Sequence, residues 1–350
     1  MRGPPLIELH THLEGSLTPA RLIALAERHA LPAAPAVCLT PDGGRYRQPS
    51  GFADFLDLYK AVTAVMRTPA DHHAVALDLA AALARDGVAY AEVSVSYGVL
   101  LRRELDPRPI QTALHEAAEE ARERLDVTMR WIPDAVRQFG PAEARRVLDA
   151  ALAGGRMRGV VGFGIGGDEA AVPATAFAAV CADARVAGLG VTIHAGETGG
   201  PDAVRDAVLA CGAARIGHGI GAVLGPLRDG ARAAPAPAEI DDTLALLAER
   251  CVFVELCPGS NLATGVVESA AAHPLRAFLD RGVPCGLGTD DRALFGLELR
   301  GEYARAAVAH GLTAAEVAGM QTAALAASFG GELLRATLRE RLAGPVGGTA

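Results

Sequence analysis

The chain has 350 residues, of which 50% are hydrophobic, 21% are charged and 4% are aromatic, and its formal net charge is -8. This composition is typical of a globular protein with a substantial core. The acidic balance disfavours binding to nucleic-acid backbones or anionic membranes, both of which require a basic surface. We therefore expect a small-molecule substrate, with no nucleic-acid partner and no membrane partner.

The six cysteines are scattered and include no closely spaced pair, and no apolar signal region precedes Glu8. Scattered cysteines are typical of buried thiols in a reducing compartment, and no run of residues is long and apolar enough to span a bilayer. These features predict a cytoplasmic protein.

The amino-terminal region begins with a short apolar strand over residues 6–9, which ends in His10-Thr11-His12. Side chains two positions apart in a strand share one face, so both histidines can reach a common point. Residues 21–29 and 52–66 have helical spacing, and a loop rich in proline and glycine over residues 31–50 separates them. We interpret residues 31–70 as a helical insertion.

Beyond residue 69, helical and strand patterns alternate regularly. Helices are expected at 70–85, 110–124, 142–153, 174–187, 202–210, 242–249 and 274–280, and strands at 88–95, 127–132, 159–163, 189–194, 214–218, 252–256 and 283–287. With the first strand, this gives eight strands separated by helices, which predicts a closed (β/α)8 TIM barrel in a single domain over residues 1–350. A doubly wound open sheet is the alternative.

Three further segments complete the expected architecture. Helical patterns at 297–310 and 313–342 are expected to cover the barrel exterior. Residues 224–239 contain a run rich in alanine and proline and form a long loop on the strand-end side. Loops of this length are either lids or disordered insertions, and both interpretations stay open.

Four candidate metal ligands fall at the ends of the first, fifth and eighth expected strands: His10, His12, His194 and Asp290. In a closed barrel these ends converge on the C-terminal mouth. Three imidazoles and one carboxylate suit Zn²⁺, with Fe²⁺, Co²⁺ and Mn²⁺ as other candidates. We predict one divalent metal ion, and Zn²⁺ first.

Six motifs occur in the order found in a known family: Glu8-Leu-His-Thr-His-Leu-Glu-Gly-Ser16, Gly162-Phe-Gly-Ile-Gly-Gly-Asp-Glu169, His194-Ala-Gly-Glu197, Gly217-His-Gly219, Cys257-Pro with Ser260-Asn261, and Gly288-Thr-Asp-Asp291. Together they resemble the adenosine deaminase family of the amidohydrolase superfamily and cover nearly the whole chain. The resemblance implies a metal-containing barrel that hydrolyses the 6-amino group of a purine and releases ammonia. Adenosine, which would become inosine, is the first expected substrate.

The resemblance also implies a role for each matched residue. His10, His12, His194 and Asp290 would be the metal ligands. Glu197 would be the general acid at purine N1, and His218 would orient and deprotonate the attacking water. On the substrate side, Asp291 would hydrogen-bond N7, the Gly167 N–H would meet N3, and Glu14 would lie near the ribose. His12 is also expected to bind the substrate.

The chain departs from the family pattern at three positions. Glu14 and Gly164 stand where classical adenosine deaminases carry Asp, and Arg292 follows the Asp pair where Pro is usual. The segment 134–139 also resembles family members that act on 6-amino-6-deoxyfutalosine, an adenosine with a bulky 5′ extension. A 5′-extended adenosine is therefore the alternative substrate.

Two other classes of function are alternatives. The glycines at 162, 164 and 167 match GxGxxG after a strand, which is a dinucleotide-binding fingerprint. However, acidic residues follow at once and Pro173 delays the next helix, so an NAD-binding oxidoreductase is a remote alternative. A non-catalytic metal-binding barrel is disfavoured because every expected catalytic position is filled.

Overall fold

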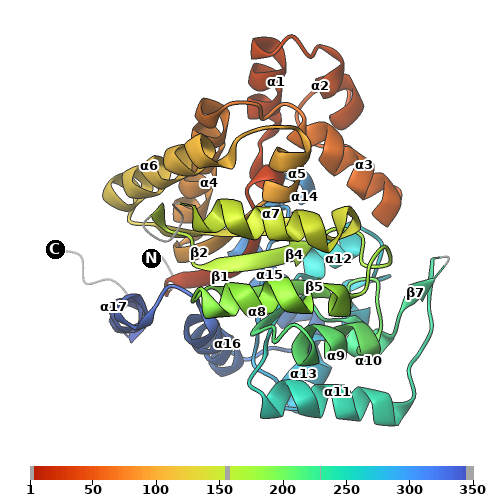
Figure 1. Cartoon of the computed structure of the whole chain (residues 1–350). Coiled ribbons are helices and arrows are strands. Elements are labelled where there is room, and N and C mark those ends of the chain that lie inside the picture. The colour runs from red at the N-terminus through yellow and green to blue at the C-terminus, as the bar shows by residue number, and fades with distance from the viewer. Residues whose placement is uncertain (1–3, 154–157, 229, 344–350) are drawn as a thin grey trace.

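The computed structural model describes residues 4–153, 158–228 and 230–343, in which eight parallel strands form the ring at the centre of Figure 1. In sheet order the strands are β1 (Leu6–His12), β2 (Val88–Val95), β3 (Thr128–Val136), β4 (Gly162–Gly166), β5 (Gly190–Ala195), β6 (Arg215–His218), β9 (Phe253–Leu256) and β10 (Cys285–Leu287). Each strand is bonded to the strand of the preceding βα unit. This order is the one expected of a (β/α)8 barrel.

The seam between the first and last strands closes the ring. Thr11 of β1 forms a parallel bridge with Asp290, just after β10. The His12 N–H donates to the Asp290 carbonyl and the Asp290 N–H donates to the His10 carbonyl, each over 3.0 Å. The closed barrel is thereby confirmed over the open-sheet alternative, and the seam itself brings three predicted metal ligands together.

Helices surround the ring in Figure 1. They are α1 (Pro19–Arg28), α2 (Ala33–Cys38), α3 (Phe52–Thr63), α4 (Pro69–Asp86), α5 (Tyr97–Arg102), α6 (Pro107–Leu125), α7 (Gly140–Leu152), α8 (Ala178–Val186), α9 (Pro201–Leu209), α10 (Gly221–Leu224), α11 (Pro237–Glu249), α12 (Pro258–Ala263), α13 (Leu275–Asp280), α14 (Arg292–Phe295), α15 (Leu299–His310), α16 (Ala314–Ala327) and α17 (Glu332–Ala343). Short 3-10 turns at Glu14–Ser16, Arg137–Phe139, Ala174–Phe177 and Ala270–Ala272 connect several of them. In Figure 1, α6 and α7 lie above the labelled strands, and α8, α9 and α11 lie below them.

Helix α4 shows how the local sequence sets these boundaries. Thr68 and Asp71 form a reciprocal capping box at its start, with Pro69 at the first position. Gly87 ends the helix with φ of 82°, a left-handed conformation that glycine adopts without steric cost. Strand β2 then begins at the next residue, and all eight of its side chains are buried.

The structure corrects several expected boundaries. The loop expected at 31–50 contains α2, and the loop expected at 224–239 contains a hairpin of β7 (Leu227–Arg228) and β8 (Ala231–Arg232) before α11 begins at Pro237. Both segments are rich in Pro and Ala. Because Pro is tolerated at the start of a helix, a high Pro content does not exclude a helix there, and assigning a loop from composition alone was wrong. Strand β4 lies three residues later than expected. Val160 forms only an isolated bridge with Trp131, and the continuous ladder to β3 begins where Gly164 pairs with Asp134.

The helical pattern expected at 313–342 is interrupted between α16 and α17, where Phe329 enters the N-terminal end of the barrel. Cβ atoms built at Gly162 and Gly190 would lie 2.8 and 2.2 Å from its ring, so these glycines make room for it. The Arg215 guanidinium carbon lies 3.9 Å from the ring centroid and forms ion pairs with the buried carboxylates of Glu92 and Glu255. Phe329 and this buried ion cluster therefore fill the end opposite the mouth.

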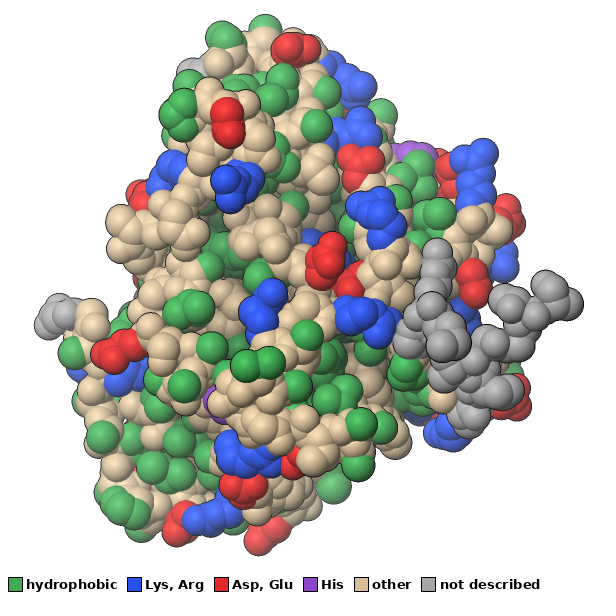
Figure 2. Space-filling view, turned by 180° about the vertical axis from the view of Figure 1, so that it is seen from behind, with side chains coloured by type: hydrophobic (Ala, Val, Ile, Leu, Met, Phe, Trp, Pro, Cys, Tyr) green, Lys and Arg blue, Asp and Glu red, His purple; other side chains and the backbone are tan. Residues whose placement is uncertain are grey.

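The surface seen in Figure 2 carries charges of both signs. Figure 2 shows acidic and basic side chains interspersed with apolar ones on the face it views. Among the described residues, no helix combines the length and apolar character that crossing a bilayer requires.

Candidate active site

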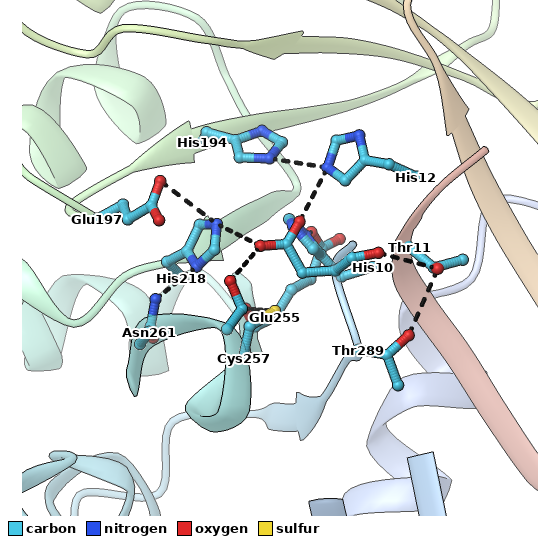
Figure 3. A network of polar contacts seen from close by, with 12 residues as sticks. His10, Thr11, His12, His194, Glu197, His218, Glu255, Cys257, Asn261 and Thr289 are labelled. Atoms are coloured by element: carbon cyan, nitrogen blue, oxygen red, sulfur yellow. Dashed lines mark hydrogen bonds and ion pairs between the residues drawn. The ribbon is translucent and has the colours of Figure 1, made fainter. Parts of the chain in front are cut away.

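Five side chains of the types that bind metal ions meet at the C-terminal ends of the strands. The ligand atoms of His10, His194, His218 and Asp290 lie within 4.8 Å of one another. The His12 Nε2 atom lies 3.3 Å from His194 Nε2 and 3.2 Å from Asp290 Oδ1. Figure 3 shows the side chains of His10, His12, His194 and His218 grouped together. The structure thus brings together the four predicted ligands and adds His218 beside them.

The donor atoms fit a metal ion. His10 Nδ1 bonds to the Glu255 carboxylate over 2.6 Å, which turns Nε2 toward Asp290 Oδ1, 3.6 Å away. That Nε2 atom is buried and has no hydrogen-bond partner among the described residues. Burial lowers the pKa of His10, but the nearby carboxylates of Asp290 and Glu255 outweigh it and raise the pKa to about 10. This excess of negative potential is suited to a cation, and three nitrogen donors with one carboxylate suit Zn²⁺.

Asp290 is held as an anion in a strained backbone conformation. Its φ is 58°, which is uncommon for a residue other than glycine, and Ser260 Oγ donates to its Oδ2 over 2.6 Å. Burial raises the pKa of Asp290, but the adjacent His10 and His12 imidazoles outweigh it and hold the pKa well below its usual value. The carboxylate is therefore charged and aimed at the histidine cluster.

Glu197 and His218 lie side by side at the edge of this cluster, with Oε2 and Nε2 3.7 Å apart. Burial, together with the nearby Asp290 and Glu169 carboxylates, raises the pKa of Glu197 well above its usual value. Burial lowers the pKa of His218 to about 3. At neutral pH a protonated carboxyl group therefore faces a neutral imidazole, which is the pairing that an acid and a base require.

The loop that carries Glu197 is fixed from two sides. The Glu169 carboxylate accepts hydrogen bonds from the N–H groups of Gly196, Thr198 and Gly199 over 2.6, 3.0 and 2.9 Å. Arg232 of the β7–β8 hairpin donates to the Glu197 carbonyl over 2.5 Å. The segment expected as a lid or a disordered insertion is thus bonded directly to the loop that carries Glu197.

Asp291 and Gly167 both line the cavity. Burial and the neighbouring Asp290 raise the pKa of Asp291 well above its usual value, so it is a neutral carboxylic acid able to donate. Gly15 touches it so closely that a Cβ there would lie 1.8 Å from Asp291 Oδ1. Gly167 has φ of 94°, and a Cβ on it would lie 2.4 Å from Gln138 Oε1.

Glu14 lies behind the cavity wall. Its carboxylate accepts hydrogen bonds from the Ser96 N–H over 2.9 Å and from the Tyr59 hydroxyl over 3.4 Å. Ser96, Tyr59 and His12 line the cavity, whereas Glu14 does not. Glu14 therefore reaches the cavity through the Tyr59 hydroxyl.

The cavity has a volume of about 510 Å³ and extends outward from the histidine cluster. Its inner part is lined by His12, His194, Glu197, His218 and Asp291, and its outer part by Phe52, Phe55, Leu56, Arg102 and Phe139. Arg102 lies over the Phe139 ring, 5.3 Å from its centroid. The cavity is of a size that binds small molecules.

Several functional neighbours were missed from the sequence. Glu255 orients His10, and Asn261 lies with its amide nitrogen 3.0 Å from His218 Nδ1. A charged residue within the apolar strand segment 252–256 is an anomaly that could have identified Glu255, because unpaired charges are rarely buried. Arg292, the departure from the usual Pro, pairs with Glu8 over 3.3 Å and Asp86 over 3.2 Å and so ties the seam to α4.

The glycines of the dinucleotide-binding fingerprint do not form the expected loop. Gly162 and Gly164 lie within β4, and the next helical residues begin only at Ala174. A dinucleotide site requires glycines in a tight turn that opens directly into a helix, so the local structure does not support the oxidoreductase alternative.

Comparison with known proteins agrees with this geometry. Residues 5–345 match the adenosine deaminase family. An aminodeoxyfutalosine deaminase of Streptomyces coelicolor is 35% identical, over 93% of this chain and 80% of its own length. An adenosine deaminase of Edwardsiella ictaluri is 34% identical, over 93% of each chain. The crystal structure of an adenine deaminase from Arthrobacter aurescens superposes with a TM-score of 0.83 at 26% identity, over 97% of this chain and 98% of its own. The chain therefore belongs to the adenosine deaminase family and is a metal-dependent hydrolytic deaminase.

Proposed function

We propose that this protein hydrolyses the 6-amino group of a purine nucleoside. The preferred substrate would be adenosine, and the products would be inosine and ammonia. One Zn²⁺ would be held by His10, His12, His194 and Asp290. The observation that carries the proposal is the placement of Glu197 beside His218, 3.7 Å apart, at the edge of these four side chains. The raised pKa of Glu197 and the lowered pKa of His218, both due first to burial, support it. When bound, a divalent ion lowers the pKa of water from 15.7 to about 7 and so supplies a nucleophile at neutral pH.

Side chains of the protein would carry out the proton transfers of the reaction. Glu197 would donate its proton to purine N1, which makes C6 more electrophilic, and the neutral His218 would accept a proton from the attacking water. Asp291, as a neutral acid, would donate a hydrogen bond to N7, and the Gly167 N–H would donate to N3. His12 and the Glu14–Tyr59 pair would lie on the sugar side.

The test is ammonia release by zinc-loaded protein from adenosine, 2′-deoxyadenosine, adenine and AMP. We expect release from the nucleosides, with adenosine giving the highest kcat/KM among these four compounds. Absence of ammonia from every 6-aminopurine nucleoside, including 5′-extended ones, would refute the proposal.

A second candidate, a 5′-extended adenosine such as 6-amino-6-deoxyfutalosine, is favoured by the outer part of the cavity. Phe52, Phe55 and Phe139 give it an aromatic wall, and Arg102, which lies over the Phe139 ring, places a cation there. A relative at 35% identity bears the name aminodeoxyfutalosine deaminase. A tenfold higher kcat/KM for the extended compound than for adenosine, about 1.4 kcal/mol, would make this the preferred substrate.

A further inference from the structure

Asp134 is a buried carboxyl group in the cavity to which the proposed chemistry assigns no role. It lies in β3, is 5% exposed and lines the cavity beside His12 and Ser96. Its Oδ1 atom has no hydrogen-bond partner among the described residues. Buried polar atoms are normally paired, and leaving one unpaired costs free energy. Oδ1 itself is enclosed by the protein, so Oδ2, which has no hydrogen bond to any described residue, is the oxygen of this cavity-lining group that can meet a donor on a ligand.

The neighbouring strand leaves space for this carboxyl group. Asp134 is the register partner of Gly164 in β4. A Cβ built at Gly164 would lie 2.6 Å from Asp134 Oδ1, and one built at Gly166 would lie 3.1 Å from Oδ2. Any larger residue at 164 would collide with the carboxyl group, so the two glycines give Asp134 its place in the cavity.

The other polar groups on this wall are already engaged. The Ser96 N–H and the Tyr59 hydroxyl both donate to Glu14. Burial raises the pKa of Asp134 to about 7; His12 opposes this and Glu14 adds to it. In either protonation state, one oxygen of the group accepts a hydrogen bond.

We propose that Asp134 binds the sugar of the nucleoside by accepting a hydrogen bond from one ribose hydroxyl. This inference rests on the proposed function. In the proposed reaction, Glu197, Gly167 and Asp291 bond N1, N3 and N7 of the base, and the 6-amino group faces the histidine cluster. The ribose hydroxyls are the remaining donors. His12 and Glu14, the residues proposed for the sugar side, are among the charged neighbours of Asp134, together with His10 and Arg137.

The experiment compares Asp134→Ala and Asp134→Asn with the unmodified protein on adenosine and its 2′-, 3′- and 5′-deoxy analogues. Asp149→Asn, on the exposed face of α7, is the matched control. Asp134→Ala should lower kcat/KM for adenosine at least tenfold, mainly through KM, and leave kcat/KM for one deoxy analogue within about threefold. Asp134→Asn keeps an acceptor oxygen and the side-chain size, and should lose less. Calorimetric Kd values for inosine and the matching deoxyinosine should show the same loss of discrimination without turnover.

Three outcomes would overturn the inference. An equal loss on all four nucleosides would mean that Asp134 does not contact a hydroxyl. Loss of zinc from both variants would mean that it supports the metal ligands instead. Unchanged kinetics in both variants would remove it from binding altogether. If the unmodified protein deaminates adenosine, each of these results refutes only this inference; if it deaminates no purine nucleoside, the proposed function itself fails.

Discussion

The most direct test of the proposed chemistry is Glu197→Gln, which replaces a carboxyl group by an amide of nearly the same shape. Glu197 is 7% exposed, and burial with the neighbouring Asp290 and Glu169 carboxylates raises its pKa well above the usual value, so the native group is neutral at pH 7. The substitution therefore changes no charge. An amide can donate a hydrogen bond to purine N1 but cannot transfer a proton to it.

The expected loss is that of a general acid, about 10²- to 10⁴-fold in kcat, or about 2.7 to 5.4 kcal/mol in the activation free energy. Folding should change little, with the melting temperature within about 4 °C of the unmodified protein, because shape and charge are kept. Zinc content should stay at one equivalent, because Glu197 lies outside the proposed ligand set. Steady-state ammonia release, thermal unfolding and metal analysis measure the three quantities. Glu116→Gln, exposed on α6, is the control. Near-native turnover by Glu197→Gln would refute the role assigned to this residue.

Four further predictions follow from the site. His194→Ala should lose zinc and ammonia release together, and metal analysis showing two equivalents in the unmodified protein would contradict a single site. Asp291→Asn should lose less kcat than Glu197→Gln, because an amide still donates toward N7; a loss as large as that of Glu197→Gln would contradict this. Gly15→Ala should lower activity and stability, because its Cβ would lie 1.8 Å from Asp291 Oδ1, and an unchanged melting temperature would contradict the rigid contact. Arg102→Ala should raise KM at least threefold for an adenosine with an anionic 5′ extension and leave adenosine unchanged; equal effects on both would exclude Arg102 as the contact for the extension.

Much of the fold was readable from the sequence because its signals are local. Helix periodicity, β-branched runs and turn residues recur along the chain, so the eight strands and the intervening helices were placed within a few residues of their observed positions. The i, i+2 spacing of His10 and His12 directs both side chains to one face of β1 for the same reason. Boundaries were missed where composition misled, as at α2 and at the β7–β8 hairpin.

The surroundings of the site depend on contacts between distant segments, which local periodicity does not encode. Glu255 reaches His10 from a strand far along the chain, and Asp134 occupies the space left by Gly164 only because β3 and β4 pair in one register. Phe329 enters the barrel where Gly162 and Gly190 leave room, and nothing in its own segment indicates that position. The sequence by itself determined the barrel and the ligand types at its strand ends. The tertiary structure decided three further features: ring closure at the Thr11–Asp290 seam, the burial that sets the protonation of Glu197 and His218, and the register that places Asp134 at the cavity. Each of them depends on contacts between residues that are far apart in the sequence.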